Sequence, residues 1–166
     1  GLFSQAVANA QKMLQVLPAL HKDMTVVRVY SLQTLGIALN ELGELTAART
    51  ALEEGLQLAQ QANMRVLDHI LVSGLATIDL QQGHLQRAIE RWAEIEQRWP
   101  DPPPHTIAEW RAGQAVAARQ AGDLATAARL AREAVGLIAP DDFGNPELFY
   151  EAIYWSCYLA LTPGDL

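Results

Sequence analysis

The sequence predicts an all-α fold, a right-handed α-α superhelix of about eight antiparallel helices. Two observations indicate it. Apolar residues recur at every third or fourth position over most of the chain, which places them on one face of a helix, and no alternating run flanked by hairpin turns indicates strands. A Gly-x-apolar motif also recurs at spacings of 42, 40, 39 and 42 residues, starting at Gly1, Gly43, Gly83, Gly122 and Gly164. Self-similarity at this period is typical of stacked helical hairpins, that is, of a solenoid.

Each glycine of the motif is expected to end one helix, because glycine enters the left-handed region without a Cβ penalty. Asp123, directly after its glycine, is a credible N-cap for the next helix. Asp23 and the Asn145–Pro146 pair are the expected starts of two other helices. First helices of the hairpins are therefore predicted at about 24–42, 64–82, 104–121 and 146–162, and the second helices are predicted to end near Pro18, Gln60, Pro100 and Pro140.

These elements form one predicted domain over residues 1–166. It comprises a half repeat at 1–18, hairpins at 24–60, 64–100 and 104–140, and a terminal helix at 146–162. Apolar residues such as Phe3 and Trp155 occur at both ends, whereas solenoids usually end in polar caps. We therefore expect the chain to be a fragment of a larger protein, or to pair with a second copy through its ends.

The bulk composition excludes several classes of function. The net charge is −7, with 12 basic residues scattered among 19 acidic ones, which disfavours direct binding of nucleic acid. No apolar stretch is long enough to span a membrane. Cys157 is the single cysteine and lies in an apolar context, so it is interpreted as a small buried hydrophobe in a reducing cytoplasm.

The repeat resembles the tetratricopeptide repeat over almost the whole chain. Its third copy has Leu75, Ala76, Gly83, Ala88, Trp92 and Pro100 at the motif positions of that family, and its second has Leu35, Gly36, Gly43, Ala48, Leu52 and Gly55. The period is about 40 residues instead of 34. This longer repeat is similar to the helical sensor region of large ATP-dependent bacterial transcription regulators of the LuxR type. The resemblance implies a cytoplasmic, non-enzymatic module without a cofactor.

The resemblance also implies a concave groove lined by the first helices. The side chains expected there are rich in amides and hydroxyls, and the lysine-asparagine clamp of chaperone-binding relatives is not matched, because the only two lysines lie near the start. The predicted groove residues are Tyr30, Gln33, Asn40, Ser73, Thr77, Gln81, Glu109, Arg119, Gln120, Tyr154 and Tyr158.

The predicted function is a protein–protein interaction or scaffold module of a bacterial transcriptional or signalling regulator. Its partner is a protein or peptide, or a second copy of the chain, and the surface used is either the groove or the open ends. The alternative is a sensor domain in which the groove takes a small, sugar-like effector. The aromatic residues near the C-terminus, including Phe149 and Tyr158, fit either a binding site or packing against a further helix.

Few residues suggest chemistry. The four histidines have no metal-ligand spacing, and no nucleophile or phosphate-loop motif occurs. Asp79 is the most unusual residue, because it occupies an apolar slot of the repeat and a buried carboxylate is costly unless it is paired. It either forms an ion pair with an arginine of an adjacent helix, such as Arg119 or Arg49, or makes a polar contact in a ligand groove.

Overall fold

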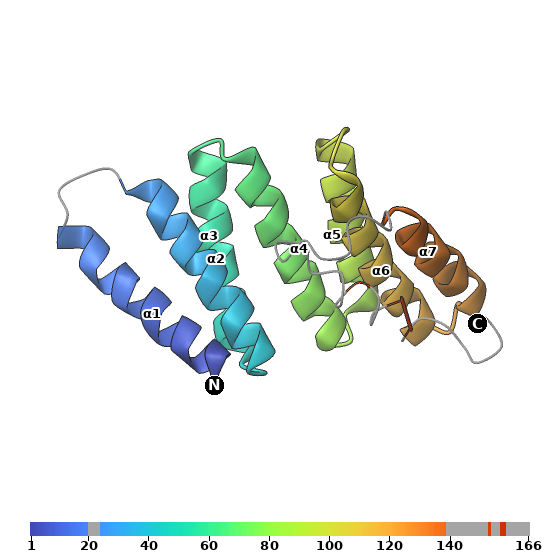
Figure 1. The fold of residues 1–166 in the computed structure, drawn as a ribbon, viewed down its shortest axis with the longest axis horizontal. Coiled ribbons are helices and arrows are strands. Elements are labelled where there is room, and N and C mark those ends of the chain that lie inside the picture. Colours follow the sequence, from blue (N-terminus) through green and yellow to red (C-terminus); the bar gives the residue numbers. More distant parts are fainter. Residues whose placement is uncertain (20–23, 139–152, 154–156, 159–166) are drawn as a thin grey trace. The chain divides into compact units, whose positions relative to one another are not determined.

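The computed structural model describes residues 1–19, 24–138, 153 and 157–158. Every regular element in these residues is helical, so the predicted all-α fold is confirmed (Figure 1). The elements are α1 (Leu2–Val16), a 3₁₀ turn (Leu17–Ala19), α2 (Thr25–Glu41), α3 (Leu45–Gln61), α4 (Arg65–Gln81), α5 (Leu85–Arg98), α6 (Pro104–Gln120) and α7 (Leu124–Gly136). Residues 153, 157 and 158 are also helical and lie within the expected terminal helix. Asp23, Pro140 and the Asn145–Pro146 pair lie outside the described residues.

The chain divides into two compact units, which we call unit 1 (Gly1–Ile78) and unit 2 (Asp79–Leu166) and describe separately. The helix bounds agree with the sequence-based prediction to within a few residues. The structure adds a finer regularity, because α2, α3, α4 and α5 begin 20 residues apart and three-residue turns join them. Each 40-residue repeat is thus two helix-and-turn segments of equal length.

The turns share one backbone geometry. In the turn after α2, Gly43 has φ of 78°, and the N–H of Glu44 donates to the carbonyl of Leu39 at 2.9 Å, the six-to-one hydrogen bond of a Schellman motif. Gly83 and Gly122 repeat this conformation, as the sequence predicts. The turn between α3 and α4 does so without glycine: Asn63 has φ of 54°, which asparagine tolerates better than most residues.

Unit 1 packs through a large side chain set against glycines. Leu52 of α3 fills the space where a side chain at Gly36 of α2 would lie, and its Cδ1 comes within 2.9 Å of the Cβ position of Gly74 on α4. The Cβ position of Gly55 on α3 lies 3.2 Å from Leu71 of α4 and 3.3 Å from Leu32 of α2. Packing of this kind places α3 against both α2 and α4 and fixes the core of unit 1.

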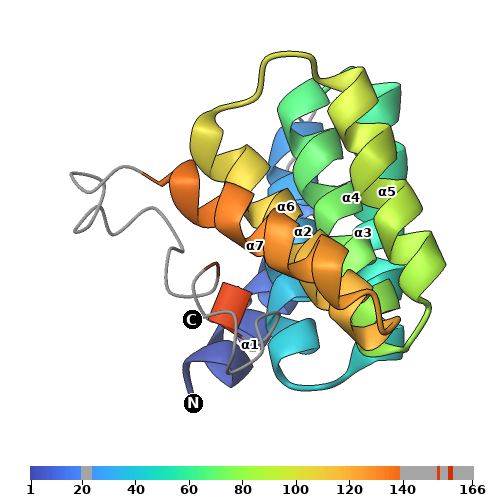
Figure 2. The same cartoon turned by 90° about the vertical axis from the view of Figure 1, so that its right-hand side faces the viewer.

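Unit 2 uses the same device with a larger side chain. The indole of Trp92 on α5 occupies the space beside Gly113 on α6, with ring atoms 2.5–3.0 Å from the Cβ position of that glycine. The hairpin of α6 and α7, whose helices lie side by side in Figures 1 and 2, has an alanine-rich core that also buries Ile153 and Cys157. Asp123 caps α7, as predicted, because its side chain accepts a hydrogen bond from the N–H of Thr126 at 3.0 Å.

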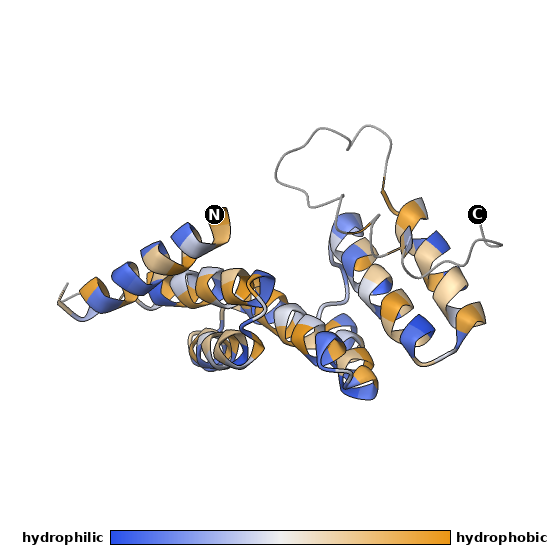
Figure 3. Ribbon diagram, turned by 90° about the horizontal axis from the view of Figure 1, so that it is seen from below, coloured by the Kyte–Doolittle hydropathy of each residue, from blue (hydrophilic) through white to orange (hydrophobic). Residues whose placement is uncertain are grey.

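First and second helices differ in how they are buried. The second helices α3, α5 and α7 carry apolar and polar residues on opposite faces, visible as orange and blue sides in Figure 3. α6, a first helix, instead buries residues around much of its circumference, since Ala108, Trp110, Ala112, Gln114, Ala115, Ala117 and Ala118 are all buried. A first helix therefore has only a narrow strip left for ligands.

Candidate functional site

The exposed strips of α2 and α4 form the first candidate site, in unit 1. On α2 the residues follow helical spacing, so they lie on one face, and the positions 40 residues later on α4 repeat it. We call this surface the α2–α4 face: Val26, Tyr30, Gln33, Ile37 and Asn40 on α2, and Val66, Ile70, Ser73 and Thr77 on α4.

The α2–α4 face is apolar and exposed in its N-terminal half. Val26 is 51 % exposed, Tyr30 53 %, Val66 57 % and Ile70 37 %, and Ile37 further along α2 is 43 % exposed. None of the nine residues of the face is charged. Clustered apolar side chains that remain exposed on a folded protein mark interaction surfaces more often than single ones do.

The C-terminal half of the face holds amides whose hydrogen bonds are incomplete. Oε1 of Gln33 and Oδ1 of Asn40 are buried and accept no hydrogen bond. Leaving a buried acceptor unsatisfied costs about 1–3 kcal/mol. Thr77 avoids this cost, because its hydroxyl donates to the carbonyl of Ser73 at 3.2 Å. Rotation of either amide would bring its oxygen to the surface, where a donor from a partner could reach it.

The structure brings together some of the predicted groove residues. Tyr30, Gln33, Asn40, Ser73 and Thr77 lie on the α2–α4 face, although Ser73 is buried. The remaining described groove residues belong to unit 2. Among them Gln81, Glu109, Gln120 and Tyr158 are exposed, and Arg119 is half-buried with an Nη1 that makes no hydrogen bond. Tyr154 lies outside the described residues, and one groove across all first helices stays a prediction.

Asp79 is ion-paired, as one of the two sequence-based interpretations expected. Its carboxylate is fully buried, and Nε of Arg91 on α5 donates to Oδ2 at 2.7 Å. Arg87, one turn earlier on α5, has Nη1 3.6 Å from Oδ1, and Nδ1 of His84 lies 3.8 Å from the same oxygen. The sequence analysis suggested Arg119 or Arg49 and missed both arginines of α5. The missing signal was the turn geometry, which folds α5 back along the end of α4.

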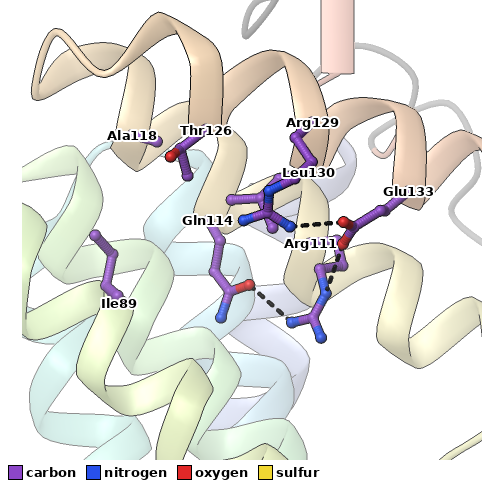
Figure 4. Close-up of a pocket in the computed structure, with 8 residues that line it drawn as sticks. All are labelled: Ile89, Arg111, Gln114, Ala118, Thr126, Arg129, Leu130 and Glu133. Atoms are coloured by element: carbon purple, nitrogen blue, oxygen red, sulfur yellow. Dashed lines mark hydrogen bonds and ion pairs between the residues drawn. The ribbon is translucent and has the colours of Figure 1, made fainter.

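Unit 2 contains a second candidate site, a cavity of about 340 Å³ (Figure 4). Three helices supply its walls. α5 contributes Ile89, and α6 contributes Arg111, Gln114 and Ala118, at helical spacing on one face. α7 contributes the remaining residues, which are Thr126, Arg129, Leu130 and Glu133. Sequence reasoning named none of these eight, because they come from three separate helices and match no motif.

Arg111 organises the polar side of this cavity. Its guanidinium donates to both carboxylate oxygens of Glu96 on α5, at 2.9 and 2.5 Å, and to Oε1 of Gln114 at 2.9 Å. Its Nε lies 3.5 Å from Oε2 of Glu133 on α7. The hydrogen bond to Glu96 raises the pKa of Arg111 above its ordinary value, and burial opposes this effect. The arginine therefore stays charged and ties α5, α6 and α7 together.

Other features offer little for catalysis. Burial raises the pKa of the Cys157 thiol to about 11, so the thiol stays protonated at neutral pH and is a poor nucleophile. Within the described ranges no three His, Cys, Asp or Glu side chains gather as a metal site would require. In the same part of the chain, no helix combines the length and apolarity that crossing a bilayer requires.

Comparison with known proteins adds no assignment. No family model matches the chain, and no curated protein matches it in sequence.

Proposed function

We propose that the chain is a protein-interaction module that binds an uncharged, apolar peptide segment of its partner on the α2–α4 face. The observation that carries the proposal is the set of five large apolar side chains, 37–57 % exposed, on equivalent positions of two consecutive first helices. Such a surface gains free energy when a partner removes it from water.

The polar half of the face supports a peptide as the partner. Gln33 and Asn40 each hold an acceptor that lacks a donor, and the backbone N–H groups of a peptide are donors that recur along a chain. Because the face carries no charge, its affinity should depend little on salt. The similarity in repeat length suggests a cytoplasmic bacterial transcriptional or signalling regulator as the parent protein, and self-association is a special case in which the partner is a second copy.

A random peptide library displayed on phage tests the proposal without a known partner. Peptides selected by the chain should be enriched in large apolar residues, and their synthetic versions should bind at least about tenfold more weakly to Tyr30→Asp and Ile70→Asp variants. Both substituted side chains are exposed, so both variants should fold, as circular dichroism would verify.

The matched control is Gln57→Asp, which adds the same charge at an exposed position of α3. Its affinity should equal that of the unchanged chain. Absence of any enriched peptide, or equal weakening by all three variants, would contradict the proposal.

A second candidate function is the sensing of a small, sugar-like effector in the groove. The incompletely bonded amides of Gln33 and Asn40 favour it, because sugar hydroxyls both donate and accept hydrogen bonds. A thermal-shift panel of mono- and oligosaccharides tests it. A sugar that raises the melting temperature of the chain, but not of a Gln33→Leu variant, would support this candidate, and an unmoved melting temperature would count against it.

A further inference from the structure

The cavity of unit 2 holds charges of both signs in close balance. Arg129 donates to Glu133 at 2.6 Å, and Arg111 approaches the same carboxylate at 3.5 Å while Glu96 holds it from α5 (Figure 4). Two arginines thus face two glutamates. A ligand with a single charge would have to displace one partner and leave the other unpaired.

The pair that a ligand would open is the exposed one. The side chains of Arg129 and Glu133 are 58 % and 42 % exposed and lie one helical turn apart on α7, and pairs of this kind contribute little to stability. Arg111 is different, because its side chain is only 20 % exposed and its fork is fixed by both oxygens of Glu96. One wall of the cavity is therefore rigid, and the other can exchange partners.

The remaining walls add donors and an apolar surface. Gln114 accepts from Arg111 through Oε1, which leaves its amide N–H groups as donors. Thr126 supplies a hydroxyl group. Ile89 and Leu130 supply aliphatic side chains. The volume of about 340 Å³ lies near the lower end of the range of small-molecule sites, roughly 300–1,000 Å³.

We propose that this cavity binds a small zwitterion, a free α-amino acid with an aliphatic side chain. The ligand carboxylate pairs with Arg129 beside the N–H groups of Gln114, and the ligand ammonium pairs with Glu133. Its side chain packs on Ile89 and Leu130. The exchange leaves no charge unpaired, which a simple acid or a simple amine cannot achieve.

Three compounds with the same branched carbon chain test the charge requirement: L-leucine, isocaproate, which lacks the ammonium group, and isoamylamine, which lacks the carboxylate. Binding to the intact chain is measured by calorimetry and by NMR chemical-shift changes at constant ionic strength. We expect L-leucine to bind at least about tenfold more tightly than either analogue. Equal or tighter binding of isocaproate would overturn the proposal, as would the absence of leucine binding.

Variants locate the site. Arg129→Gln should weaken leucine binding at least about tenfold, and Gln114→Met should weaken it with little change in side-chain volume. The control is Arg98→Gln, which removes an arginine from an i, i+4 pair with Glu94 on α5 that does not line the cavity. Leucine bound equally by Arg129→Gln and Arg98→Gln would overturn the assignment. Tyr30→Asp should leave leucine binding unchanged, so the outcome is separate from that of the peptide experiment.

Discussion

Units 1 and 2 are built on the same 40-residue pattern but resolve one position in opposite ways. Leu39 of α2 and Ala51 of α3 are both buried in unit 1. Forty residues later, unit 2 has Asp79 and Arg91, joined at 2.7 Å. An apolar contact and a buried ion pair thus serve equivalent places in one fold.

The difference extends to charge and surface. Residues 1–78 contain five lysines and arginines and six aspartates and glutamates, whereas residues 79–166 contain seven and thirteen. Unit 1 offers an uncharged, partly apolar face, and unit 2 offers a cavity surrounded by ion pairs. The comparison teaches that the repeat determines where helices lie, while its variable positions determine which kind of ligand each unit can take.

The largest expected effect comes from making unit 2 resemble unit 1 in part. Asp79→Leu alone should lower the free energy of unfolding by about 3 kcal/mol, because it removes one partner of a buried pair and leaves Arg91 without its acceptor. Asp79→Leu combined with Arg91→Ala should recover more than half of this loss, since it restores the apolar contact of unit 1. Urea denaturation measures both. A double variant as unstable as the single one would show that the two positions are not interchangeable.

A smaller effect should separate the two packing devices. Gly113→Ala should lower the free energy of unfolding by about 2–3 kcal/mol, because the rigid indole of Trp92 cannot bend away from a new methyl group. Gly36→Ala meets the flexible Leu52 and should cost about 1–2 kcal/mol. Combining Gly113→Ala with Trp92→Leu should remove much of the difference. Gly136→Ala, which meets nothing within 4 Å, is the control, and a Gly113→Ala variant as stable as this control would refute the account.

The smallest effect concerns pH and the cap of α7. The hydrogen bond from the backbone N–H of Thr126 lowers the pKa of Asp123 below its ordinary value. The stabilisation by this carboxylate is therefore present above the unfolded pKa and is lost as pH falls through the lower, folded pKa. Asp123→Asn keeps a capping side chain but cannot titrate. Its melting temperature should fall less steeply than that of the unchanged chain in acid, and identical slopes would show that Asp123 contributes nothing there.

Much of the fold could be predicted from the sequence, because it is recorded in local signals. Gly43, Gly83 and Gly122 mark left-handed turns, Asp123 marks a cap, and the apolar spacing marks the faces between them. Asn63 escaped notice, because asparagine is a weaker signal of the left-handed region than glycine. The equal length of the two halves of each repeat was missed for that reason.

Less of the candidate sites could be predicted. The resemblance placed Tyr30, Gln33 and Asn40 on one face, but the exposure of Val26 and Val66 beside them depends on how the neighbouring helices pack. The cavity could not be predicted at all, since Ile89, Arg111 and Glu133 belong to three helices and meet only after folding.

By itself the sequence determined that the chain is helical, where the helices begin and end, and that Asp79 needs a partner, because turn conformation, capping and burial cost are properties of short segments. Only the tertiary structure decided which arginine pairs with Asp79, which glycine receives Trp92, and which side chains enclose the cavity. These contacts join residues on different helices, and their geometry depends on side-chain volumes across the whole interface and not on the period of any one helix.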